Sequence, residues 1–202
     1  VMSADMDELV SLFQRGNHID GERAARELIG KSPGSGFAWK ALGAMLQAQG
    51  KKEEALEAKK VAVDLLPDDA EAACNLGRSY FELGQVRDAV VALDRAVSIR
   101  PDYAEAFNNL GLALNADGQL QKAHDCFERA IRLRPDFAEA WNNLSGIFNA
   151  NGQLDGAIHA LERALDAKKD YRIAYDNLLF VLNYDADKRA EEIYEAYAEY
   201  RS

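Results

Sequence analysis

The sequence predicts an all-α solenoid, a stack of antiparallel helix pairs, and three observations carry this prediction. Residues 104–137 match their neighbours at a shift of 34 positions, so that AEAFNNLG corresponds to AEAACNLG on one side and to AEAWNNLS on the other. Glycines and prolines recur with the same period. Apolar residues within the unit follow the i, i+3, i+4, i+7 spacing of helices. A period of this length with helical spacing is typical of repeat arrays.

The glycines mark the end of the first helix of each pair, and the prolines mark the end of the second. Glycine takes the left-handed conformation that closes a helix, and proline has no amide hydrogen to donate. The glycine series is Gly16, Gly50, Gly84, Gly118 and Gly152, and the proline series is Pro33, Pro67, Pro101 and Pro135. Lys169 replaces the next proline, so we expect the second helix of 138–171 to end differently.

Short motifs mark the starts of the first helices. DDAE (68–71), DYAE (102–105) and DFAE (136–139) each place Glu three residues after Asp. This spacing resembles a capping box, in which the first side chain accepts a hydrogen bond from the backbone of the first turn. The sequence therefore predicts that Asp caps these helices.

These markers divide the chain into a divergent N-terminal repeat or cap at 1–35, repeats at 36–171, and a partial repeat with a C-terminal capping or linker helix at 172–202. The four repeats span 36–69, 70–103, 104–137 and 138–171. An apolar stripe at helical spacing marks the tail, namely Ala190, Ile193, Tyr194, Tyr197 and Tyr200. Either this helix closes the solenoid, or it docks onto a further region and exposes apolar surface through which the chain self-associates.

Composition excludes several classes of partner. The 202 residues carry a net charge of −10, which disfavours binding to nucleic acid or to an anionic membrane surface. No apolar run reaches the ~18 residues of a membrane span, and the N-terminus does not resemble a signal peptide. Cys74 and Cys126 are far apart and form no CxxC motif. We therefore expect a cytoplasmic chain without nucleic-acid or membrane partners.

The repeat unit resembles the tetratricopeptide repeat. Leu-Gly pairs stand at 42–43, 76–77 and 110–111. The first large position of the unit holds Trp39, Ala73, Phe107, Trp141 and Tyr175. The second helix has two columns of small residues. One is Ala55, Ala89, Ala123 and Ala157, and the other is Ala62, Ala96, Ala130 and Ala164. The resemblance implies a right-handed superhelical solenoid whose first helices line a concave face.

Asparagine recurs on the first helices in two columns. The first is Asn75, Asn109, Asn143 and Asn177, and the second is Asn115, Asn149 and Asn183. An amide side chain offers two hydrogen-bond donors and an acceptor, and Asn is a mediocre helix former. We interpret the columns as a ladder that holds the backbone of a protein or peptide ligand in the concave groove. The alternative is a solvated face whose asparagines recur only because the repeats share a common origin.

Chaperone-binding tetratricopeptide domains offer one comparison for this groove. In such domains, Lys, Asn and Arg side chains form a clamp that holds two carboxylates of the ligand. Lys40 and Asn75 match two of its places, whereas Ala44, Glu105 and Asn109 occupy the other three. The clamp is incomplete, so a chaperone tail is not the expected ligand.

The asparagine column and the segment 175–202 resemble the O-linked N-acetylglucosamine transferases and their SPINDLY-like relatives. The segment is similar to the one that joins the last repeat to the catalytic region in bacterial members of that family. The resemblance implies that the concave ladder holds substrate polypeptide, and that the chain is the substrate-recognition part of such a glycosyltransferase.

No residue pattern in the chain indicates catalysis, a cofactor or a metal site. His18, His124 and His159 fall in different repeats without metal-ligand spacing, and there is no phosphate-binding loop. We therefore expect this chain to be a non-catalytic scaffold for a protein or peptide ligand. The alternative is a self-associating structural adaptor, such as a homodimer, with no attached catalytic region.

Overall fold

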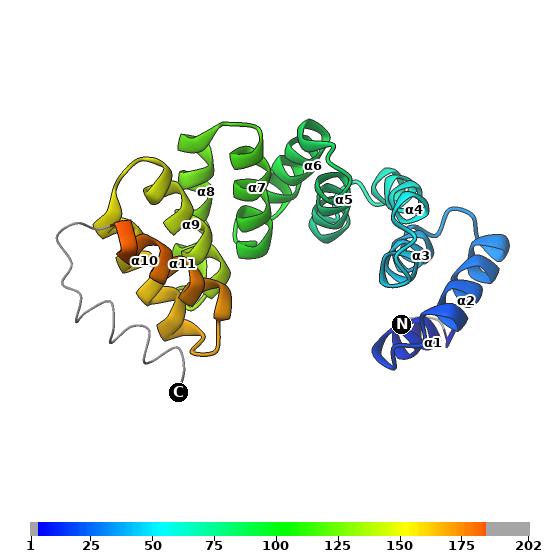
Figure 1. Ribbon diagram of the computed structural model, residues 1–202. Coiled ribbons are helices and arrows are strands. Elements are labelled where there is room, and N and C mark those ends of the chain that lie inside the picture. The colour runs from blue at the N-terminus through cyan, green and yellow to red at the C-terminus, as the bar shows by residue number, and fades with distance from the viewer. Residues whose placement is uncertain (1–3, 185–202) are drawn as a thin grey trace. The chain divides into compact units, whose positions relative to one another are not determined.

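The computed structural model describes residues 4–184, in which all the regular elements are α-helices (Figure 1). The chain divides between Pro101 and Asp102 into two compact units, which are described separately. Each unit is built from antiparallel helix pairs joined by short turns, so the expected all-α class is confirmed.

The N-terminal unit contains three helix pairs, and in each pair the two helices pack against each other. The pairs are α1 (Ala4–Gln14) with α2 (His18–Lys31), α3 (Gly36–Ala48) with α4 (Lys52–Leu65), and α5 (Ala70–Glu82) with α6 (Val86–Ile99).

The C-terminal unit contains two helix pairs and a single last helix. The helices are α7 (Ala104–Ala116), α8 (Leu120–Leu133), α9 (Ala138–Ala150), α10 (Leu154–Ala167) and α11 (Arg172–Tyr184). Leu178, Val181 and Leu182 of α11 lie in one apolar cluster with residues of α10. The predicted tail helix, with its stripe from Ala190 to Tyr200, lies outside the described residues. The division into cap, repeats and tail stays a prediction.

The glycine prediction is confirmed at the end of each first helix. All five glycines of the series have positive φ, between 70° and 79°. In α3, for example, the helix ends at Ala48, Gln49 is its C-cap and Gly50 follows. A residue with a Cβ is strained in this conformation, which explains why glycine recurs there.

The prediction for the end of α10 is wrong. This helix ends at Ala167 although no proline follows, and the amide of its C-cap Lys168 donates to the carbonyl of Ala164. The amide of Arg134 makes the equivalent bond to Ala130 at the end of α8, where Pro135 does follow. The local hydrogen bonding therefore ends the helix in the same register with or without the proline.

The predicted capping boxes are also wrong. The caps of α7 and α9 are Tyr103 and Phe137, neither of which makes a side-chain cap hydrogen bond. The preceding aspartates lie one position too early. At α5 the cap is Asp69 and not Asp68, and its carboxylate accepts from the amides of Glu71 and Ala72 at 2.9 and 3.0 Å.

The core between paired helices depends on small residues facing large ones. The two alanine columns of the second helices are at most 1% exposed. Gly111 of α7 lies against the ring of Phe127 of α8, so closely that a Cβ on the glycine would be 2.6 Å from the ring. The Leu-Gly pair therefore allows the largest side chain of the second helix to pack against the backbone of the first.

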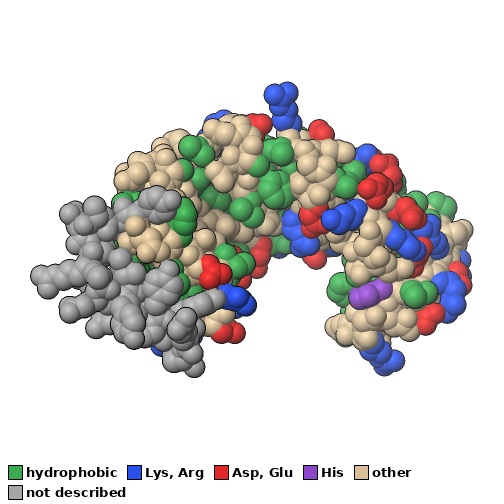
Figure 2. Space-filling model, viewed as in Figure 1, with side chains coloured by type: hydrophobic (Ala, Val, Ile, Leu, Met, Phe, Trp, Pro, Cys, Tyr) green, Lys and Arg blue, Asp and Glu red, His purple; other side chains and the backbone are tan. Residues whose placement is uncertain are grey.

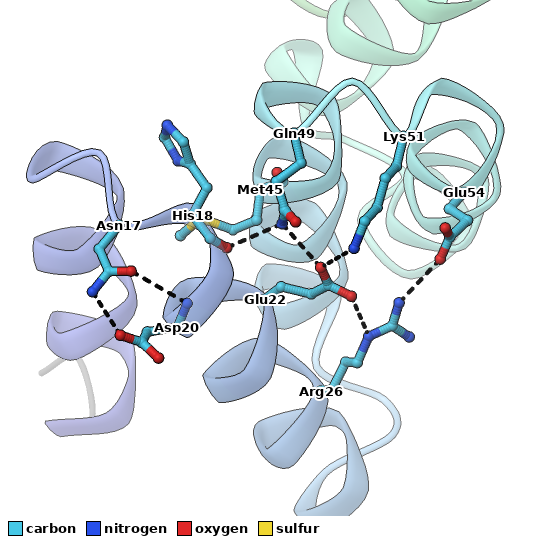
Figure 3. A network of polar contacts seen from close by, with 9 residues as sticks. All are labelled: Asn17, His18, Asp20, Glu22, Arg26, Met45, Gln49, Lys51 and Glu54. Atoms are coloured by element: carbon cyan, nitrogen blue, oxygen red, sulfur yellow. Dashed lines mark hydrogen bonds and ion pairs between the residues drawn. The ribbon is translucent and has the colours of Figure 1, made fainter.

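A polar network centred on Glu22 joins α2 to the following helix pair (Figure 3). The Glu22 carboxylate accepts hydrogen bonds from Lys51 at 2.7 Å and from Gln49 and Arg26 at 2.9 Å. Arg26 also reaches Glu54 at 3.3 Å. The hydrogen bond from Lys51 is the largest influence on the pKa of Glu22, which is lowered to about 2 although partial burial opposes the shift. The network thus fixes the divergent first pair to the second.

Candidate functional site

A groove of about 640 Å³ lies along the first helices of the N-terminal unit, α1, α3 and α5. Its α1 and α3 walls are mainly apolar, and Val10 and Phe13 in them are 37% and 47% exposed. Large side chains at such exposure on a concave surface are typical of ligand-binding grooves. The apolar walls consist of Leu9, Val10, Phe13, Phe37, Ala41, Ala44, Met45 and Ala48.

Polar and charged residues from α3, α4 and α5 line the rest of the groove: Lys40, Gln47, Lys59, Glu71, Asn75 and Arg78. Figure 2 shows the surrounding surface, where Lys and Arg side chains alternate with Asp and Glu over α2 to α4. The groove therefore combines apolar walls with several cationic side chains, in a chain whose net charge is negative.

Lys59 is the buried cation of this groove. It is 7% exposed, and its ammonium group donates to the Ser79 hydroxyl at 2.6 Å and to the Gln47 side-chain oxygen at 3.1 Å. Burial lowers the pKa of Lys59 to about 8, the charge of Arg78 acts in the same direction, and Glu82 opposes them. Both hydrogen-bond partners are neutral, so the direct contacts of the ammonium group are with dipoles, and Glu82 acts on its charge without an ion pair in the described residues.

Lys40 is held differently. Its ammonium group forms ion pairs with Glu71 at 2.6 Å and with Asp69 at 2.9 Å. Burial acts to lower the pKa of Lys40, but the hydrogen bonds to these two carboxylates outweigh it and raise the pKa. Two intramolecular carboxylates therefore already engage the lysine that matches the chaperone-type clamp.

The first asparagine column makes hydrogen bonds between successive repeats. In the C-terminal unit, the amide of Asn143 donates to the side-chain oxygen of Asn108 at 2.9 Å, and that of Asn177 donates to Asn142 at the same distance. Asn109 and Asn143 are half-buried, and Asn177 is exposed. In the N-terminal unit, the half-buried Asn75 lines the groove. The column thus connects the first helices α7, α9 and α11.

The second asparagine column is less uniform. Asn115 and Asn183 are exposed, whereas Asn149 is half-buried. Asn183 donates a hydrogen bond at 2.9 Å to the carbonyl of Leu179, one turn earlier in its own helix. No bond resembling the inter-repeat pairs of the first column joins these three residues within the part of the chain that the structure describes.

Sequence reasoning missed two features of the site. It selected Asn143 and Asn177 but not their acceptors, Asn108 and Asn142, although the repeated Asn-Asn dipeptides marked them. It also did not select Lys59, because the alternating Lys and Glu residues of 51–60 are typical of a solvated charged face. The repeat register offered a signal, because Lys59 falls in a column that is otherwise apolar.

Comparisons with known proteins agree with this architecture. A family model described as tetratricopeptide repeat matches residues 7–70 and 116–172, and one described as TPR repeat matches residues 77–118. The first model alone covers more than half of the chain, so the protein belongs to the tetratricopeptide repeat family. A comparison with curated protein sequences finds no match.

Solved structures with the same fold include several repeat proteins. A structure of MamA is 27% identical, with a TM-score of 0.73, and the match covers 82% of this chain and 90% of MamA. PilF of Pseudomonas aeruginosa is 18% identical, with a TM-score of 0.83 and coverage of 98% and 87%. YrrB, described as a TPR protein with an unusual peptide-binding site, is 19% identical, with a TM-score of 0.73 and coverage of 85% and 89%. At these lower identities, PilF and YrrB show the fold alone.

No helix within residues 4–184 is long and apolar enough to cross a membrane. Within the same part of the chain, no group of His, Cys, Asp and Glu side chains could hold a metal ion.

Proposed function

We propose that the chain is a protein-interaction scaffold that binds extended polypeptide along the faces of its first helices. The inter-repeat asparagine pairs carry this proposal. Each amide has two donors and one acceptor. The bonds from Asn143 to Asn108 and from Asn177 to Asn142 use one donor of each column residue. For Asn143 and Asn177, no other side-chain hydrogen bond is formed within residues 4–184, so the remaining donor and the oxygen can bind a ligand.

The pairing also orients the amides. A side chain that is held by its neighbour loses less conformational entropy when a ligand binds, which favours affinity. Hydrogen bonds to the backbone of a ligand do not depend on its side chains, so we expect the ladder to tolerate many sequences. YrrB, described as a TPR protein with an unusual peptide-binding site, supports peptide binding as a role for this fold.

The test compares asparagine variants with a matched control. Peptides are first selected on the wild-type chain from a random display library. The double variant Asn143→Ala, Asn177→Ala should then bind them at least about tenfold more weakly, since each lost amide removes about one hydrogen bond. The control Gln121→Ala removes an exposed amide from the second helix α8 and should bind as the wild type does. Unchanged affinity of the double variant, with intact helicity, would assign the asparagines a purely structural role.

The finer proposal is that the parent protein is an O-linked N-acetylglucosamine transferase-like enzyme, with this chain as its substrate-recognition part. The resemblance of the asparagine column and of residues 175–202 motivates it. Reading the gene beyond Ser202 tests it, because a glycosyltransferase region must follow in the same frame. We also propose a cytoplasmic location, on the basis of the two widely spaced cysteines. The absence of a disulfide at Cys74 and Cys126 is compatible with that compartment.

Self-association is the alternative function, and one observation favours it. On α11, Ile173 and Phe180 are 58% and 53% exposed. Sedimentation of the chain over a range of concentrations, with and without residues 186–202, tests whether a homodimer forms. A dimer on which the random display library yields no binding peptide would replace the scaffold proposal.

A further inference from the structure

Lys59 occupies a column of the repeat that is otherwise part of the core. The residues at the same place in the next three repeats are Leu93, Phe127 and Leu161, and all are at most 1% exposed. Lys59, Leu93 and Phe127 each lie against the glycine of the Leu-Gly pair in the first helix of their own repeat. A Cβ on Gly43 would be 2.7 Å from the Lys59 side chain, much as one on Gly77 would be 2.5 Å from Leu93. The stem of Lys59 therefore fills the space that leucine fills elsewhere.

The ammonium group of Lys59 lowers the stability of the folded chain at this position. The structure gives Lys59 no ion pair among residues 4–184, and its contacts with Gln47 and Ser79 are to neutral oxygens. Glu82, an acidic group whose charge favours the protonated lysine, accepts a hydrogen bond from Gln47 at 2.5 Å. A buried cation that makes no ion pair lowers stability, and residues that break the rules of the fold are expected at functional sites.

Arg78 adds a second unneutralised charge to the same groove. It projects from α5, is exposed, and forms no ion pair within the described part of the chain. Lys40, which also lines the groove, already has Glu71 and Asp69 as partners. The groove therefore has two positive charges, those of Lys59 and Arg78, that form no ion pair within the described residues and that a ligand carboxylate can neutralise.

We propose that this groove binds an acidic side chain, Asp or Glu, of a polypeptide whose neighbouring apolar side chains lie against Val10 and Phe13. The proposal rests on the proposed function and names the class of ligand for the N-terminal unit. Charge complementarity carries it, since the carboxylate meets Lys59 and Arg78 while the apolar walls exclude water and strengthen the interaction.

An acidic side chain fits better than a chain terminus. Lys59 lines the groove from the second helix α4 and is only 7% exposed, whereas most of the lining residues come from the first helices α1, α3 and α5. A carboxylate on a flexible stem reaches that depth while the backbone passes over the surface. A terminal carboxylate would require the end of the main chain, with its polar groups, to be buried. The lowered pKa agrees with this site, because a bound carboxylate restores the stability of the charged form.

The experiment uses oriented peptide pools with blocked termini. Each pool has Glu, Gln or Lys at a fixed central position, flanked by mixed apolar and small residues. Fluorescence polarisation on the full chain at pH 7 should show the Glu pool binding about tenfold or more tightly than the Gln pool. Lys59→Leu should bring the two pools to within about twofold of each other, and Arg78→Gln should reduce the preference in part. The control Arg87→Gln, exposed on α6 and outside the groove, should retain it.

Three outcomes would overturn the proposal. They are equal binding of the Glu and Gln pools to the wild-type chain, an undiminished preference in Lys59→Leu, or stronger binding of a pool whose only carboxylate is a free C-terminus. Lys59→Leu restores the residue used in neighbouring repeats, so the variant is expected to fold. A chain that binds peptides without a preference for Glu refutes this inference alone. Failure to bind any pool or any library peptide refutes the proposed function as well.

Discussion

Replacing Lys59 by leucine should stabilise the protein at neutral pH. A fall in pKa from 10.5 to about 8 corresponds to about 3 kcal/mol of destabilisation whenever the folded lysine is charged. The variant removes the Lys59 donor from the Ser79 hydroxyl, which is 2% exposed, and leaves the Gln47 oxygen with the longer hydrogen bond from Ser79 at 3.4 Å, at a cost of about 1–2 kcal/mol. The net gain in unfolding free energy at pH 7 should therefore be about 1–2 kcal/mol.

The pH dependence of the unfolding free energy distinguishes removal of the buried charge from better packing of leucine. The folded pKa lies below the unfolded one, so the unfolded state binds more protons between pH 8 and 10.5 and the stability of the wild type rises there. Below pH 8 the folded lysine is charged, and the wild type carries the full destabilisation of about 3 kcal/mol. The gap between the variant and the wild type should hence be largest at pH 7 and shrink towards pH 10.

Urea unfolding followed by circular dichroism, at several pH values between 7 and 10, measures the gap. Phe127→Leu serves as the control, because it alters the same column in another repeat without changing charge. A variant less stable than the wild type at pH 7, or a gap independent of pH, would refute the electrostatic reasoning.

The remaining predictions concern the fold. Glu22→Gln should cost about 1 kcal/mol at pH 7, allowing for water access to its partners. The pKa of Glu22 is lowered to about 2 from 4.5, so its contribution is present above pH 4.5 and is lost as the pH falls towards 2, as acid unfolding of the variant and wild type would show. Gly111→Ala should destabilise by about 1–3 kcal/mol in urea unfolding, because its Cβ meets the Phe127 ring. Gly30→Ala, which meets nothing within 4 Å, should be neutral or slightly stabilising in the same assay and is the control. Gly118→Ala should cost about 1 kcal/mol in thermal unfolding, since φ there is 79°.

The sequence predicted the helix pairs well because the backbone conformation and the packing of the helices require the same residue types at the same places in every repeat. Gly118 must adopt positive φ, and Ala130 must allow close approach of helices, so both types recur visibly. Helix caps were predicted poorly. Asp102 and Asp136 have the correct spacing to Glu, but a shift of one residue removes their side chains from the capping position.

The candidate site was only partly predictable for a related reason. Asn143 recurs in a column and could be selected, but whether its amide bonds to a neighbour depends on the packing of α7 against α9. Lys59 stands in a run rich in Lys and Glu, which is typical of a solvated helix face. Lys59 occupies the same position of the repeat as Phe127, and only this alignment indicates that it lies in the core.

The asparagine column and Lys59 differ in what they demand of a ligand. The pair formed by Asn143 and Asn108 consists of neutral amides, which bond to any polypeptide backbone and confer little selectivity. Lys59 is a buried charge that discriminates a carboxylate from its neutral analogue, because a neutral ligand leaves the cation without a counter-charge. If both act, the ladder provides general affinity and Lys59 provides specificity. A change at Lys59 should then alter which polypeptides bind, whereas a change at Asn143 should weaken all of them alike.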